Sequence, residues 1–96
     1  MTILSKKQQR LNPHAQIQTL CRIGKRAYMK ADHLESLLAP EGYLTNNATE
    51  LEQARARHEV VLLNHRAAEA VREIEEIARA HGIRTYPPRF LRSVGR

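Results

Sequence analysis

Apolar residues recur every three or four positions over two long stretches of the chain, which is the spacing of one face of an α-helix. The first stretch follows Asn12-Pro13, where Asn can cap a helix and Pro fits the first helical position. It ends before Pro40, which cannot continue a helix. We therefore predict a helix over residues 13–39 with Asn12 as its N-cap. Its apolar stripe consists of Ile17, Leu20, Cys21, Gly24, Ala27, Tyr28, Ala31, Leu34 and Leu38.

The second stretch contains neither Gly nor Pro between Ala48 and His81. Asn47, with Glu50 three residues later, is similar to a capping box, and Gly82 supplies the left-handed residue that often ends a helix. These signals predict a second helix over residues 47–81, roughly 50 Å long at about 1.5 Å per residue. Its apolar stripe consists of Val60, Leu63, Ala67, Val71, Ile74 and Ala78.

The remaining segments are short and polar. Pro40-Glu41-Gly42 predicts a turn over residues 40–46, so the two helices should run antiparallel. Residues 1–11 form a basic arm before the first helix, and residues 83–96 form an extended basic tail after the second. The fold class is therefore all-α, with residues 1–96 as a single helical domain. Four aromatic residues and no Trp also suit packing of helix on helix.

The two predicted helices differ in length, so a hairpin leaves part of the second helix uncovered. Val60, Val61, Leu62 and Leu63 also place apolar groups around most of its circumference. A homodimer with a four-helix arrangement would bury them, and we expect this assembly. The alternative is a monomer in which residues 2–11 fold back over the gap. The predicted dimer interface consists of Val60, Leu63, Ala67, Val71 and Ile74.

Charge is distributed unevenly along the chain, whose formal net charge is +6. Residues 1–30 contain seven basic side chains and no acid, whereas residues 31–83 contain ten acids and five bases. The net positive charge therefore lies at the two ends, which antiparallel packing could unite into one basic pole. Alternatively, the acidic middle of the second helix pairs with a basic helix of a partner subunit. The predicted partner-binding residues are Arg10, Arg22, Arg26, Tyr86, Arg89, Phe90 and Arg92.

A basic chain favours an acidic partner, and nucleic acid is one candidate. No helix-turn-helix with a short turn is visible, and aromatic residues are not interleaved with the basic ones. Sequence-specific DNA recognition is therefore not expected, while nonspecific attraction to the phosphate backbone remains open.

Catalytic or metal-binding residues are not grouped in this sequence. His58 and His65 are seven residues apart on one helix, or roughly 10 Å, which is too far for one metal ion without a second chain. Cys21 lies within an apolar stripe, which predicts a buried, inert thiol. Glu73, Glu75 and Glu76 fit a solvated helix face. We expect no cofactor, no metal and no enzymatic activity.

The location follows from two features. A single cysteine excludes an internal disulfide, and no apolar run is long enough for a signal peptide or a membrane span. We expect a cytoplasmic protein that does not contact a membrane.

The end of the second predicted helix, His81-Gly82-Ile83-Arg84-Thr85-Tyr86, resembles a stretch in a helical phage-encoded anti-CRISPR protein that inhibits type I-E systems. The basic tail that follows differs from that group. A second similarity links Lys30-Ala31-Asp32-His33-Leu34 to the plasmid-encoded quorum-sensing antiactivators, which also have two long antiparallel helices. Both groups are small inhibitors that bind a larger host protein. The resemblance implies the same role here and transfers no residue roles.

These observations together predict a small, non-enzymatic binding protein that inhibits or regulates a larger host protein or nucleoprotein complex. Two other functions remain open. One is a nucleic-acid-associated accessory protein that uses the basic pole, and the other is a structural subunit of a helical bundle.

Overall fold

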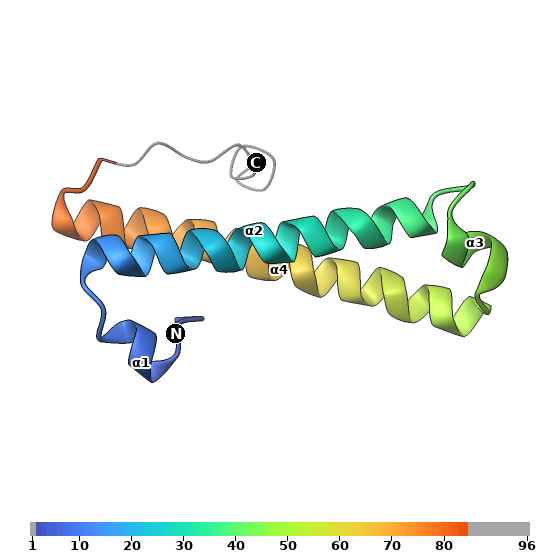
Figure 1. Cartoon of the computed structure of the whole chain (residues 1–96), viewed down its shortest axis with the longest axis horizontal. Coiled ribbons are helices and arrows are strands. Elements are labelled where there is room, and N and C mark those ends of the chain that lie inside the picture. The colour runs from blue at the N-terminus through green and yellow to red at the C-terminus, as the bar shows by residue number, and fades with distance from the viewer. Residues whose placement is uncertain (1, 85–96) are drawn as a thin grey trace.

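Two long antiparallel helices form the body of the chain in the computed structural model, which describes residues 2–84 (Figure 1). Helix α2 runs from Pro13 to Leu38 and helix α4 from Glu50 to His81, and the two pack against each other. Two short helices accompany them, α1 (Lys6–Gln9) before α2 and α3 (Tyr43–Asn47) in the connection. Residues 2–84 contain no strand, so the predicted all-α hairpin is confirmed.

Helix α2 begins where the sequence signals predict and ends one residue before the predicted end. The side chain of Asn12 accepts a hydrogen bond from the amide of Ala15 at 2.9 Å, and Pro13 occupies the first helical position. The last helical residue is Leu38, and Ala39 closes the helix by donating its amide to the Ser36 carbonyl. The cap works because Asn satisfies an amide that the first helical turn leaves without a partner.

The start of α4 corrects the prediction, because the helix begins at Glu50 rather than at residue 47 and its N-cap is Thr49 rather than Asn47. Asn47 is the last residue of α3, and its side chain donates to the carbonyl of Tyr43 at 2.9 Å. The capping box is instead formed by Thr49, whose hydroxyl accepts from the amide of Glu52, while the Glu52 carboxylate accepts from the amide of Thr49. Thr is a common residue in this motif. The segment predicted as a turn over residues 40–46 therefore includes most of a short helix.

The end of α4 confirms the predicted C-cap. Gly82 has a φ angle of 62°, in the left-handed region, where a residue without a Cβ is favoured. The amide of Ile83 then donates to the carbonyl of Ala78 at 2.8 Å. Only Ile83 and Arg84 of the predicted tail are described, and residues 85–96 lie outside the described part of the chain.

The core is a narrow seam between α2 and α4. Many of its residues are small, which lets the two backbones come close together. Leu20 is fully buried and is the largest side chain with so little exposure. The buried residues from α2 are Ile17, Leu20, Gly24, Ala27 and Ala31, and those from α4 are Val60, Ala67, Ala70, Val71, Ile74 and Ala78.

The N-terminal arm packs on the end of this seam rather than extending away from it. Leu4 is only 6% exposed and contacts the cluster that contains Leu20 and Ile74. The amide of Ile3 donates to the carboxylate of Glu73 on α4 at 3.0 Å. The fold-back arm, considered above as the alternative to a dimer, is therefore present in the single chain. It covers the end of the hairpin at which α2 begins and α4 ends (Figure 1).

The hairpin is thin, with extents of 49 × 26 × 16 Å. Residues on the side of each long helix that faces away from the other helix are exposed. Each long helix therefore buries one stripe and leaves its opposite face uncovered. Within residues 2–84, no helix is sufficiently long and apolar to cross a membrane.

Candidate partner-binding surface

Helix α2 carries a row of exposed cations that runs from its outer side to the edge bordering α4. The buried positions Leu20, Ala27 and Ala31 face the seam, so the positions between them project outwards. All four basic residues of α2 are exposed, and three of them follow one another at steps of four residues. We call this surface the basic face of α2, and it consists of Arg22, Lys25, Arg26 and Lys30.

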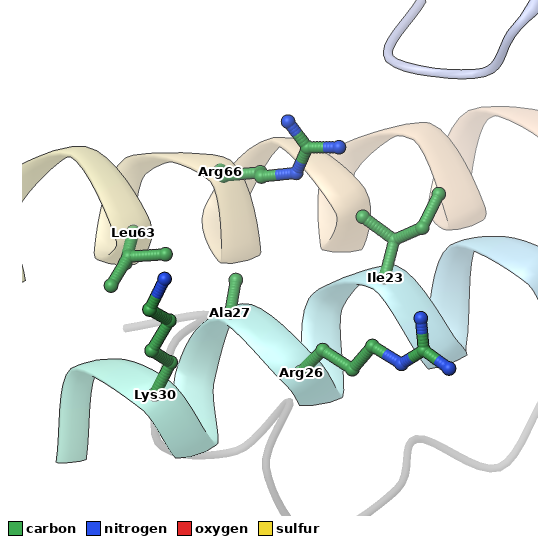
Figure 2. Close-up of a pocket in the computed structure, with 6 residues that line it drawn as sticks. All are labelled: Ile23, Arg26, Ala27, Lys30, Leu63 and Arg66. Carbon is green, nitrogen blue, oxygen red and sulfur yellow. The ribbon is translucent and has the colours of Figure 1, made fainter. Parts of the chain in front are cut away.

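One edge of this face borders a shallow groove between the two long helices, with a volume of about 220 Å³. Figure 2 shows that Ala27 and Leu63 lie across from each other in it, with the Lys30 ammonium turned toward Leu63. Its lining combines an apolar floor with a cationic rim. We call it the basic groove. The floor consists of Ile23, Ala27 and Leu63, and the rim of Arg26, Lys30 and Arg66.

The three rim cations differ in how they are paired. The Lys30 ammonium lies 3.2 Å from the carboxylate of Glu59, but both side chains are largely exposed, so this pair contributes little to stability. Arg26 and Arg66 form no ion pair with another residue of the described chain. The groove therefore offers two unpaired guanidinium groups, each able to donate two parallel hydrogen bonds to a carboxylate or phosphate.

An acidic surface lies on a different side of α4, around a second pocket of about 400 Å³. It is lined by Glu69, Arg72, Glu73 and Glu76. Part of this charge is used within the chain. Glu73 accepts the amide of Ile3, and Glu69 lies 3.0 Å from the His65 ring and 3.5 Å from the Arg72 guanidinium.

Cys21 lies beside the seam and packs against the cluster around Leu20. Burial raises the pKa of its thiol, because the thiolate would lose solvation there. The protonated thiol is a poor nucleophile, so this environment favours the packing role predicted for Cys21 over covalent chemistry. Among residues 2–84, no three His, Cys, Asp or Glu side chains are grouped closely enough to hold a metal ion.

The structure brings together only some of the predicted partner-binding residues. Arg22 and Arg26 share the basic face of α2, while Arg10 is exposed at the end of α1. The antiparallel arrangement places the start of α2 at the same end as the last turn of α4 (Figure 1). The other four residues lie outside the described part of the chain, and they are Tyr86, Arg89, Phe90 and Arg92.

Sequence reasoning missed Arg66 and Ile23 as lining residues of the groove. The signal was present, because Arg66 follows Leu63 by three residues and so lies at the margin of the same stripe. What the sequence did not supply was which residues of α2 face that margin.

The predicted dimer interface is placed differently by the structure. Val60, Ala67, Val71 and Ile74 are between 0% and 8% exposed, and they are buried against α2 of the same chain. Leu63 is half-buried and lines the basic groove. These five residues thus belong to the intramolecular seam and its margin. In this arrangement α2 covers four of them, and Leu63 remains partly exposed at the groove.

Comparison of the chain with protein-family models, with curated proteins and with solved structures gives no match.

Proposed function

We propose that this chain is a small, non-enzymatic binding protein that regulates or inhibits a larger protein or nucleoprotein complex through its basic groove. The observation that carries the proposal is the combination of an apolar floor with Arg26 and Arg66 on the rim, neither of which forms an ion pair within residues 2–84. An apolar floor rewards burial of a side chain, and the guanidinium groups select an anionic neighbour.

The partner chemistry that fits this groove is an acidic segment with an apolar side chain between its carboxylates. Arg is among the residues most often found as interface hot spots, especially where neighbouring contacts exclude water. The basic face of α2 extends the positive surface beyond the groove and would steer an acidic partner toward it. The resemblance to small phage and plasmid inhibitors supports the same type of role.

The probe is a fluorescently labelled helical peptide in which Glu and Leu residues alternate from one helical turn to the next. Its binding to the protein is measured by fluorescence anisotropy. We expect the double variant Arg26→Glu/Arg66→Glu to bind at least about tenfold more weakly, which corresponds to about 1.4 kcal/mol. The matched control is Arg57→Glu/Arg79→Glu, which makes the same charge change at exposed positions of α4 outside the groove. The control should retain most of the affinity.

Repeating the measurement at several salt concentrations distinguishes long-range electrostatic attraction from direct contacts in the groove. Raising the ionic strength should reduce the difference between parent and groove variant, because exposed charges are screened over about 10 Å at 0.1 M salt. If the groove variant and the control lose affinity equally, the groove has no specific role. The affinity would then depend only on the net positive charge of the protein and not on where the arginines lie.

Nucleic-acid association is the second candidate, and the row of four exposed cations on α2 is the observation that favours it. Such a row suits phosphate contacts without sequence recognition. A fluorescent nonspecific duplex tests it. If the duplex binds more tightly than the acidic peptide and its affinity falls steeply with salt, the accessory role replaces the inhibitor role.

Two further parts of the proposal concern assembly and location. We propose that the protein acts as a homodimer, through a surface that leaves the basic groove free. We also propose a cytoplasmic location, where the single cysteine would remain a reduced thiol.

A further inference from the structure

The face of α4 that points away from α2 exposes large apolar residues. Leu51, Val61 and Leu62 are 62%, 63% and 55% exposed. They lie on the helix that is already buried along its opposite side, so α4 has one buried apolar stripe and, on its exposed surface, a few large apolar residues among polar ones. An exposed surface of this kind on a thin hairpin is a candidate interface.

One stripe on this exposed surface follows the spacing of a coiled-coil seam. Six positions are separated alternately by four and three residues, which keeps them on one side of a helix. Five of these positions are exposed, and Glu69 is half-buried. We call this set the outer stripe of α4, and it consists of Leu51, Arg55, His58, Leu62, His65 and Glu69.

The charges of the outer stripe are arranged symmetrically about Leu62. Arg55 precedes Leu62 by seven residues, and Glu69 follows it by seven. If a second copy packs antiparallel with the two-fold axis at Leu62, Arg55 of each copy meets Glu69 of the other. A parallel arrangement would instead place Arg55 against Arg55 and Glu69 against Glu69, which repel each other.

We propose that the outer stripe of α4 is a homodimer interface, in which a second copy of this chain packs antiparallel with Leu62 at the centre. The order of layers is then α2, α4, α4 and α2, so Leu62 at the centre of the outer stripe is covered by the second copy. The basic faces of α2 lie on the two outer sides of this assembly. The interface therefore does not depend on the proposed function of the basic groove.

The first experiment is sedimentation equilibrium of the whole chain from micromolar to millimolar concentration. We expect a reversible dimer, and we expect Leu62→Glu to raise its Kd by at least about tenfold. The matched control is Met29→Glu on α2, because Met29 is 59% exposed and lies outside the outer stripe. The control should dimerise like the parent. Both residues are exposed in the single chain, so neither change should disturb folding, which circular dichroism checks.

The second experiment tests the antiparallel register. Arg55→Glu and Glu69→Arg should each weaken the dimer, and the double variant should recover affinity because each ion pair is rebuilt in the opposite sense. A chain that stays monomeric over the whole concentration range overturns the proposal. So do equal effects of Leu62→Glu and Met29→Glu. A double variant as weak as the single variants overturns the antiparallel register.

Discussion

Leu20 is the residue whose truncation should most clearly test the hairpin core. Its side chain is 0% exposed and lies among Ile17, Ile74 and Leu4, so residues from α2, α4 and the N-terminal arm all contact one cluster. We expect Leu20→Ala to lower the free energy of unfolding without changing the helical content of the folded protein.

The size of the effect follows from the complete burial of Leu20. Replacing Leu by Ala removes about three carbon groups, worth about 0.8 kcal/mol each in transfer free energy. The cavity left behind adds to this loss, so we expect about 3–4 kcal/mol, within the range measured for such substitutions. For a domain of this size each kcal/mol lowers Tm by about 4–8 °C, which gives a decrease of at least about 12 °C.

The assay is urea and thermal unfolding followed by far-ultraviolet circular dichroism, with Met29→Ala as the control. Met29 lies on the same helix and is 59% exposed, so its truncation should change the free energy of unfolding by no more than about 0.5 kcal/mol. A loss below about 1 kcal/mol for Leu20→Ala would refute the packing described here. So would an equal loss for Met29→Ala, because the two faces of α2 would then be assigned incorrectly.

Substitutions test the connection and the cap, and a chemical modification tests the thiol. Gly42→Ala should destabilise the fold, because a Cβ there would collide with the backbone carbonyl of Leu37; thermal unfolding measures the loss, and an unchanged Tm would contradict the close approach. Thr49→Ala should cost about 1 kcal/mol by removing the capping box with Glu52, whereas Asn47→Ala, at the wrongly predicted cap, should cost less. Burial raises the pKa of Cys21 in the folded state, so this group favours folding below its unfolded pKa and loses that contribution as pH rises through the folded value. At pH 8 the native thiol should therefore react with an aromatic disulfide reagent more slowly than the urea-unfolded chain, and equal rates would show that Cys21 is not protected.

The long helices could be predicted because their signals are local. Asn12-Pro13 and Gly82 mark an end of each helix through hydrogen bonds within a few residues, and the three-to-four spacing gives the buried stripe. The start of α4 was wrong because two capping patterns overlap in this segment. Asn47 with Glu50 and Thr49 with Glu52 both have a polar residue three positions before a Glu. Only the structure shows that Asn47 is the last residue of α3 and that Thr49 caps α4.

Tertiary features were harder to predict because they join distant residues. The Ile3 amide reaches Glu73 across 70 positions, and nothing in the local sequence of the arm specifies that partner. Leu4 looked like one of a few scattered apolar residues in a basic segment, although it completes the core cluster. The basic groove could not be predicted for the same reason, since Arg26 and Arg66 line one groove only after the two helices have packed.

The assignment of the dimer interface shows why a helix with apolar residues on two sides is difficult to interpret from sequence. Both stripes of α4 have helical spacing, so periodicity alone cannot say which one packs within the chain. Residue size distinguishes them. The stripe that faces α2 contains Ala67, Ala70 and Ala78, and the buried stripe of α2 contains Gly24, Ala27 and Ala31, so small residues are frequent on both sides of the seam.

The other stripe has the features of an interface between separate molecules. In this stripe Leu51 and Leu62 lie among charged and His side chains, which can remain solvated before association. A surface that mixes large apolar residues with polar ones can be exposed to solvent in the free chain and buried in a complex. A stripe of small residues contributes to stability only when it is closely packed against another helix. On this reasoning the small residues form the fold, and the exposed leucines are the residues that the proposed dimer would cover.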